Sequence, residues 1–180
     1  FYNTSGAGNM CVAPPPDPAP SDAPVAPTAA ASGVISLYSD AYTDVASNTN
    51  PGWSEVVSDE IHASNNVKKT TNFLPFQLNA PIDTTSKTTL HVDVWLAELP
   101  SAGAGLLIKM LDAANGPHEG NYMHPMSSLT AGQWNSIEIP LSSFTQVNGT
   151  WDATARSRVD QVLVDIVDDA AMFVDNVYFH

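Results

Sequence analysis

The chain has 180 residues and a formal net charge of −13, since 19 Asp and Glu residues outnumber six Lys and Arg residues. This length suits one domain with an appendage. The charge argues against nucleic acid and anionic membranes as partners, because both require basic patches. No segment approaches the roughly 20 apolar residues of a membrane-spanning helix, and we expect no membrane insertion.

The N-terminal region has the composition of a tether. Seven of the 14 prolines lie between residues 13 and 32, among alanines and serines, and such a composition favours an extended, semi-rigid spacer. We therefore divide the chain into the tail of an upstream region (1–12), a Pro/Ala-rich linker (13–33) and a folded domain (34–180). The linker implies other modules tethered in the same polypeptide. Cys11 is the single cysteine, which excludes a disulfide within the chain.

From residue 34 onward, short segments of alternating or β-branched apolar residues dominate. Such segments, when bounded by Pro, Gly and Asn, are typical of strands. They predict strands at residues 35–40, 55–61, 67–72, 73–78, 90–95, 106–111, 135–141, 159–167 and 172–179. No segment combines helix caps with a 3.6-residue period, since the nearest one contains Gly103 and Gly105. The pattern predicts an all-β fold, an antiparallel β-sandwich or jelly roll.

The clearest predicted strand is Leu-His-Val-Asp-Val-Trp, at residues 90–95. Its period of two places three apolar side chains on one face, which we expect in the core: Leu90, Val92 and Val94. The opposite face, which we expect to be exposed to solvent, carries His91, Asp93 and Trp95. A histidine, a carboxylate and a tryptophan in a row form an unusual surface, which favours a binding role.

Four motifs resemble, in the same order along the chain, those of a known group of proteins. They are Ile-Ser-Leu-Tyr-Ser-Asp-Ala-Tyr-Thr-Asp-Val (35–45), Leu-His-Val-Asp-Val-Trp (90–95), Gly-Gln-Trp-Asn-Ser-Ile-Glu-Ile-Pro-Leu (132–141) and Phe-Val-Asp-Asn-Val-Tyr-Phe (173–179). With these motifs, the chain resembles the galactose-binding-like β-sandwich carbohydrate-binding modules attached to bacterial laminarinases and other glycan-degrading or glycan-capturing proteins. The resemblance implies a jelly roll, glycan binding without catalysis, and a structural calcium ion.

Three aspartates are the candidate ligands of that calcium ion. Asp40 and Asp44 lie just after the first strand, and Asp175 lies in the last strand, which pairs near the first in this architecture. Calcium takes about six to eight oxygen ligands from carboxylates and carbonyls, so it would join the N-terminal edge to the last strand. The alternative is that Asp40 and Asp44 form turns and that Asp175 is solvated.

Two tryptophans are the candidate sugar-stacking residues, because a flat aromatic face packs well on the apolar side of a pyranose. Trp95 is the leading candidate, and the alternative is that it caps the core. Trp53 lies in the turn-rich segment Asn-Pro-Gly-Trp and is either a second platform or a lid over the core. Trp151 has the same two interpretations with less support, and we interpret Trp134 as structural.

Polar partners for the sugar hydroxyls are predicted from isolated charges in the strands. Lys109 and Asp165 are each the single charge in an apolar segment, and such a charge faces water or has a specific partner. If their strands neighbour residues 90–95, a concave face is lined by His91, Asp93, Lys109 and Asp165. The alternative is a structural ladder of salt bridges, which contributes little stability.

No catalytic arrangement stands out, and we do not expect an enzyme. Asp93 and Asp165 form one of many carboxylate pairs that match the requirement of a glycosidase, but 19 acidic residues produce such pairs by chance. His118, Glu119 and His124 lie in a segment with Pro and Gly, which we interpret as a loop bordering the glycan site and not as a metal site.

The sequence therefore predicts a monomeric, non-catalytic module that binds a polysaccharide. The first-choice ligand is a neutral β-glucan such as laminarin, a β-1,3-glucan. The module would hold a multimodular secreted or cell-surface protein of a bacterium on that polysaccharide. Two alternatives stay open: a calcium-dependent structural or adhesive sandwich, and a polysaccharide-degrading β-sandwich enzyme.

Overall fold

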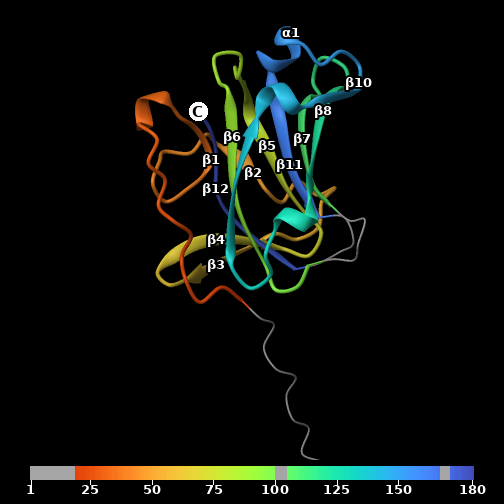
Figure 1. Cartoon of the computed structure of the whole chain (residues 1–180). Coiled ribbons are helices and arrows are strands. Elements are labelled where there is room, and N and C mark those ends of the chain that lie inside the picture. Colours follow the sequence, from red (N-terminus) through yellow and green to blue (C-terminus); the bar gives the residue numbers. More distant parts are fainter. Residues whose placement is uncertain (1–18, 100–104, 167–170) are drawn as a thin grey trace, which may run out of the picture.

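The computed structural model describes residues 19–99, 105–166 and 171–180, and most of these form two antiparallel sheets packed face to face (Figure 1). Sheet A has the strand order β3-β4-β12-β6-β9, and β1 also pairs with β12. Its strands are β1 (Ile35–Tyr38), β3 (Ser58–His62), β4 (Asn65–Thr70), β6 (Thr89–Leu96), β9 (Trp134–Pro140) and β12 (Met172–Phe179). The predicted all-β sandwich is confirmed.

Sheet B has the strand order β10-β8-β7-β11-β5-β2. Its strands are β2 (Ser47–Asn48), β5 (Phe73–Ile82), β7 (Gly105–Asp112), β8 (His118–Pro125), β10 (Thr145–Asn148) and β11 (Val159–Ile166). A one-turn helix, α1 (Ala153–Arg156), begins where the Asp152 carboxylate accepts hydrogen bonds from two backbone N–H groups. Short 3-10 helices lie at Ala31–Gly33, Met126–Ser128 and Leu141–Ser143. None of the helices in the described ranges is long and apolar enough to cross a membrane.

The core lies between the two sheets and follows the period-two pattern of the strands. Leu90, Val92 and Val94 of β6 are fully buried, as predicted, and they belong to the same core cluster as Val162 and Val164 of β11. Each such side chain contributes roughly 1.5–3 kcal/mol relative to its exposed state. The alternation therefore identified the inward face of the central strand.

The segment around His118 was predicted to be a loop, and this prediction is wrong. It forms strand β8, which pairs with β7 along its whole length and with β10 on its other side. Gly120, which suggested a loop, is needed in this strand because the ring of Trp151 occupies the space that a Cβ atom would fill. The short strands β2 and β10 were also missed, since two to four residues carry too little periodicity to be recognised.

The polar face of β6 was predicted to be exposed, and the structure contradicts this. His91, Asp93 and Trp95 are only 8%, 0% and 6% exposed. Side chains of the neighbouring strands β12 and β9 pack beside them on the same face: Phe173 and Trp134 flank Trp95, and Tyr178 stacks on His91. Alternation shows that a strand has two different faces, but it does not show whether the more polar one meets water.

The N-terminal strap, residues 19–33, lies against the outer side of sheet A. Two residues of the strap, Pro20 and Pro24, are buried. The carbonyl of Asp22 accepts a hydrogen bond of 2.7 Å from Trp134 Nε1–H, and the carbonyl of Ala29 accepts one of 2.8 Å from the Tyr42 hydroxyl. The described part of the predicted linker is thus in contact with the sandwich, while the domain boundaries remain a prediction.

Candidate functional site

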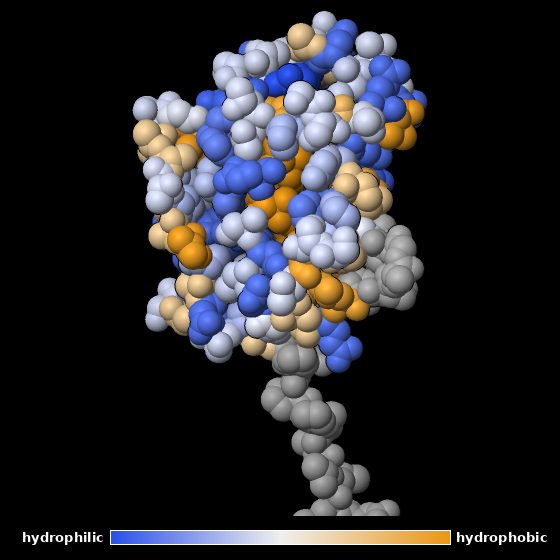
Figure 2. Space-filling view, viewed as in Figure 1, coloured by the Kyte–Doolittle hydropathy of each residue, from blue (hydrophilic) through white to orange (hydrophobic). Residues whose placement is uncertain are grey.

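Exposed aromatic surface is the first requirement of a sugar site, and it is scarce among the residues that the structure describes. Figure 2 shows one side of the molecule, which is mainly hydrophilic, with a hydrophobic strip near its centre and smaller hydrophobic groups toward its edges. In the described part of the chain, the exposed large hydrophobic side chains are Val25, Trp53, Val56, Ile61, Leu99, Met123 and Val147. Trp53, which is 53% exposed, is the aromatic member of this set.

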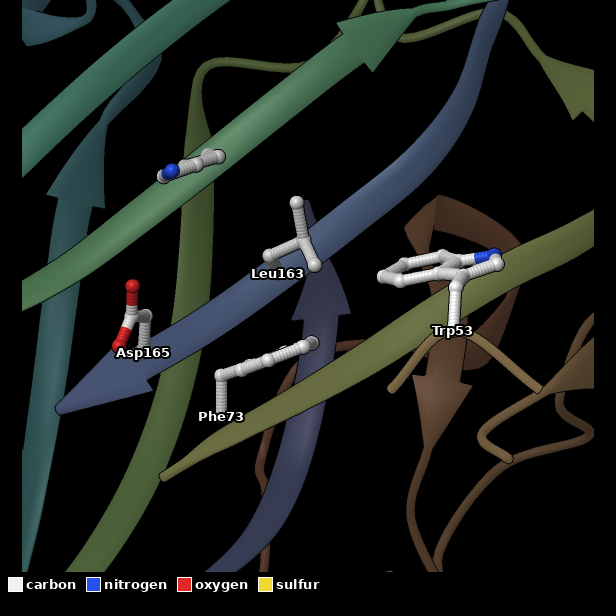
Figure 3. Close-up of a pocket in the computed structure, with 5 residues that line it drawn as sticks. Trp53, Phe73, Leu163 and Asp165 are labelled. Atoms are coloured by element: carbon white, nitrogen blue, oxygen red, sulfur yellow. The ribbon is translucent and has the colours of Figure 1, made fainter. Parts of the chain in front are cut away.

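Trp53 lies beside a pocket on the outer face of sheet B (Figure 3). The pocket has a volume of about 210 Å³. Its five lining residues come from four places in the chain: Trp53 from the connection after β2, Phe73 from β5, Lys109 from β7, and Leu163 and Asp165 from β11. The structure therefore brings together three of the six predicted sugar-binding residues: Trp53, Lys109 and Asp165.

The pairing of strands explains why these residues meet. Leu163 stands opposite Lys109 in the β11–β7 pair, and Asp165 stands opposite Phe73 in the β11–β5 pair. Directly opposed residues of antiparallel strands have Cβ atoms about 5 Å apart on the same face. The neighbouring inward residues, Val162 and Val164, are fully buried, so the pocket residues face outward by the same alternation.

The apolar part of the pocket is a pair of stacked rings. The rings of Trp53 and Phe73 have centroids 6.1 Å apart and an interplanar angle of 14°, and Figure 3 shows both rings beside Leu163. This stacking orients the indole ring of Trp53, although the residue is half-exposed and lies in the connection after β2. The arrangement can hold the apolar side of a sugar ring while Lys109 donates to hydroxyl groups and Asp165 accepts from them.

Sequence reasoning missed Phe73 and Leu163 as parts of the site. The signal that could have found them is the alternation that turns Lys109 and Asp165 outward, because it turns Leu163 outward too. The same alternation leaves further side chains of this face half-buried: Gln77, Leu107, Leu111, Asn121 and Gln161. Together they extend a mixed polar and apolar surface across the sheet from the Trp53 pocket.

The other three predicted sugar-binding residues lie elsewhere. His91 and Asp93 are on β6 in sheet A, whereas Lys109 and Asp165 are on the outer face of sheet B. The predicted shared concave face is therefore not formed, because the two pairs belong to different sheets. Trp95 is also on β6, where it packs edge-to-face on Phe173 with ring centroids 5.5 Å apart. The structure gives Trp95 the capping role that was its alternative.

His91 and Asp93 belong to a buried hydrogen-bond network. His91 Nδ1 lies 2.7 Å from Glu138 Oε1, and His91 Nε2 lies 3.2 Å from Asp93 Oδ1. Asp93 also accepts hydrogen bonds from Ser136 and from Asn176 Nδ2. Because each ring nitrogen faces a carboxylate oxygen, the geometry favours the doubly protonated imidazolium. Burial lowers the pKa of His91, but the hydrogen bonds and charges of Asp93 and Glu138 exceed this effect and raise it overall.

The three predicted calcium ligands are not gathered at one point. Asp44 accepts a hydrogen bond of 2.5 Å from the Ser36 hydroxyl, and Asp40 accepts hydrogen bonds from the backbone and side chain of Asn66. Asp175 is buried and accepts from the side chain of Asn65. In the described ranges, no group of three or more His, Cys, Asp or Glu side chains is placed to hold a metal ion.

Asp40 is near enough to Asp175 for its negative charge to act on the Asp175 carboxyl group. Burial raises the pKa of Asp175 to about 6, and the negative charges of Asp40 and Asp93 act in the same direction. A nearby cation would oppose both effects by stabilising the ionised carboxylate. Asp44 lines a pocket with Tyr38 and Lys68.

The remaining candidates have structural roles. His118 Nδ1 accepts a hydrogen bond from the backbone of Thr150, and His124 bonds with the Ser128 hydroxyl. Trp151 is packed against the core. Trp134 contacts the Trp95 cluster and holds the N-terminal strap, in agreement with its structural interpretation.

No family model matches the chain, and no curated protein sequence matches it. Several solved structures share its fold. The family 30 carbohydrate-binding module of a cellulosomal cellulase of Clostridium thermocellum superposes with a TM-score of 0.53 and 14% identity, covering 82% of this chain and 96% of that one. Another family 30 module gives a TM-score of 0.56 at 11% identity, with 82% and 98% covered.

A third similar structure is the non-crystalline cellulose specific module CBM28, with a TM-score of 0.50 and 14% identity over 82% of this chain and 87% of that one. At these identities the similarity shows the fold. The chain therefore has the β-sandwich architecture found in carbohydrate-binding modules.

Proposed function

We propose that this protein is a non-catalytic carbohydrate-binding module that binds a neutral β-glucan on the outer face of sheet B. The observation that carries the proposal is the pocket in which the half-exposed Trp53 is stacked on Phe73 beside Lys109 and Asp165. Stacking aromatic and hydroxyl-binding groups within one pocket are what a pyranose requires. The fold shared with carbohydrate-binding modules supports the same conclusion.

A neutral ligand agrees with the charges. The pocket contains one lysine and one aspartate, and the chain as a whole carries −13, which disfavours an anionic polysaccharide. A β-glucan is supported by the similar structure CBM28, a module specific for non-crystalline cellulose. Laminarin is our first choice within that class because of the sequence motifs. The module would be part of a secreted or cell-surface bacterial protein and would raise its local concentration on the polymer.

The test is native affinity electrophoresis of the whole chain in gels containing laminarin, mixed-linkage glucan, amorphous cellulose, xylan or alginate. We expect retardation by a β-glucan and a loss of affinity of at least roughly tenfold, or about 1.4 kcal/mol, in the Trp53→Ala variant. Val56→Ala is the matched control, because Val56 is an exposed apolar residue of the same connection outside the pocket.

The outcomes separate the candidate functions. Equal retardation of wild type and Trp53→Ala would place the sugar elsewhere, and retardation by alginate would exclude a neutral ligand. Free migration of the folded protein in every gel would favour a structural or adhesive role. Release of reducing sugar from any of these polymers would identify an enzyme.

We also propose a structural calcium ion bound by Asp40 and Asp175, joining the connection after β1 to β12. The raised pKa of the buried Asp175 supports it, because a cation would offset the cost of the buried charge. Chelation with EDTA is then expected to lower the melting temperature, and added Ca²⁺ to restore it. An unchanged melting temperature would contradict this proposal, and Asp44→Asn, which alters the third aspartate, should leave the calcium effect intact.

A further inference from the structure

A second pocket opens at the edge of the sandwich, between the two sheets. Its volume is about 320 Å³. Sheet A contributes Leu37 and Tyr38 from β1 and Lys68 from β4, and sheet B contributes Phe76 from β5. The rest of the lining comes from the chain around β2: residues 44–46 precede this strand, Ser47 belongs to it, and Thr49 follows it.

Five of the nine residues that line the second pocket match those of the Trp53 pocket by type. Each contains one lysine, one aspartate, one leucine and two aromatic side chains. The members that correspond by type are Trp53, Phe73, Lys109, Leu163 and Asp165 in one pocket, and Tyr38, Phe76, Lys68, Leu37 and Asp44 in the other. The second pocket adds the hydroxyl groups of Ser47 and Thr49.

The polar groups of the second pocket are held in place by neighbours. Lys68 Nζ lies 5.0 Å from the centre of the Tyr38 ring and 2.6 Å from Asp59 Oδ1. Asp44 is fixed by the hydroxyl of Ser36 at 2.5 Å. Burial, helped by the charge of Asp59, raises the pKa of Tyr38, so its phenol keeps its proton and can donate a hydrogen bond.

We propose that this pocket is a second saccharide site, which takes the end of a neutral glucan chain. The proposal rests on the proposed function for the class of ligand, but not on the Trp53 pocket being the main site. The opposite charges of Lys68 and Asp44 favour a neutral polar ligand over an ion, because Lys68 would repel a cation and Asp44 would repel an anion. Both sheets line the pocket, so it lies at the edge of the sandwich and suits the end of a chain, whereas the Trp53 pocket lies on the face of one sheet.

The two pockets are connected through shared elements. Phe73 and Phe76, three residues apart on β5, point to opposite faces of that strand and line one pocket each. Thr49 and Trp53 belong to the same connection after β2 and also line one pocket each. A molecule with both sites occupied would hold one glucan along sheet B and the end of a second chain at the sandwich edge, which increases avidity for a polymer network.

The test is a titration of the isotopically labelled whole chain with a linear β-1,3-glucose hexasaccharide, and in parallel with its β-1,4 counterpart, followed by NMR chemical shifts and by calorimetry. We expect two sets of shifts, one around Trp53 and one around Tyr38 and Thr49, and a stoichiometry above one. In the Trp53→Ala variant the second set should persist. In the Asp44→Asn and Thr49→Val variants, the affinity that the second set of shifts reports should fall roughly tenfold, because each variant loses a hydrogen bond in a charged site.

Thr43→Val is the matched control for Thr49→Val, since Thr43 is exposed in the same stretch and does not line the pocket. A stoichiometry of one with every shift lost in Trp53→Ala would overturn the second site and leave the proposed function intact. Shifts confined to Tyr38 and Thr49, and unchanged in Trp53→Ala, would support the second site and overturn the Trp53 pocket as the main one. No shift with either oligosaccharide would overturn both.

Discussion

Trp53 and Trp95 have identical side chains and opposite surroundings. Trp53 is 53% exposed and stacked on one ring at the edge of a pocket. Trp95 is 6% exposed and belongs to a cluster with Val67 and Phe173. At the scale of single residues, burial therefore decides whether an aromatic side chain contributes to binding or to stability.

Replacement of Trp95 by alanine is expected to destabilise the protein and to leave glycan affinity unchanged while it stays folded. Removal of a buried tryptophan costs about 3–5 kcal/mol, because the cavity is not refilled. Urea unfolding measures this loss, and affinity electrophoresis below the unfolding transition measures binding. A binding defect in Trp95→Ala without loss of stability would contradict the assignment.

His91 is expected to make stability depend on pH above about 6.5. Its pKa in the folded protein is raised above the unfolded value by Asp93 and Glu138, against the effect of burial. The stabilisation is therefore fully present below the unfolded pKa and is lost as the pH rises through the folded pKa. Urea unfolding at about pH 6.5 and about pH 9 should show lower stability at the higher pH.

The His91→Gln variant is the control for this prediction. Gln cannot carry the charge, so the difference in stability between the two pH values should shrink. An equal pH dependence in the variant and the wild type would show that other groups cause it. The pKa of Glu138 is a second quantity to measure, because His180 and His91 lower it despite the opposing effect of burial.

At the scale of elements, the N-terminal strap is expected to be part of the stable fold. Deletion of residues 1–18 keeps every strap contact described above, whereas deletion of residues 1–33 removes them, including the bond from Lys87 to the carbonyl of Gly33. The longer deletion should lower the free energy of unfolding by about 2 kcal/mol or more, through lost burial and hydrogen bonds. Thermal unfolding of the two truncated chains measures the difference.

A single substitution tests the same element more finely. Trp134→Phe keeps an aromatic ring but removes the indole N–H that binds the carbonyl of Asp22, and about 0.5–1.5 kcal/mol should be lost with this hydrogen bond. The loss should disappear when the substitution is made in the chain that lacks residues 1–33. Equal stability of the two truncated chains would show that the strap contributes nothing.

At the scale of the whole molecule, the sequence predicted the strands better than their arrangement. The alternation in β6 correctly placed Leu90 and Val94 in the core. It did not assign β6 to sheet A or β7 and β11 to sheet B, because sheet membership depends on pairing between distant segments. For that reason His91 was predicted to share a face with Lys109, and the two lie on different sheets.

The candidate site was predictable to the same limited extent. Lys109 and Asp165 stood out as single charges in apolar segments, and Trp53 as an aromatic residue in a turn. Their meeting point depends on the register of β11 against β5 and β7, which periodicity alone does not fix. The side chains that bury Trp95 likewise come from other strands, such as Phe173 of β12 and Trp134 of β9, and the local sequence contains no sign of them.

The scarcity of basic residues has one more consequence. The chain has four lysines, and Lys109 and Lys68 line one pocket each. The other two, Lys69 and Lys87, are engaged with Glu60 and with the carbonyl of Gly33. Amine-specific methylation followed by mass spectrometry would therefore report each pocket separately. A sugar that fills a pocket shields its lysine, and the two remaining lysines serve as internal references. The protein thus carries a natural reporter group in each of the two proposed sugar pockets.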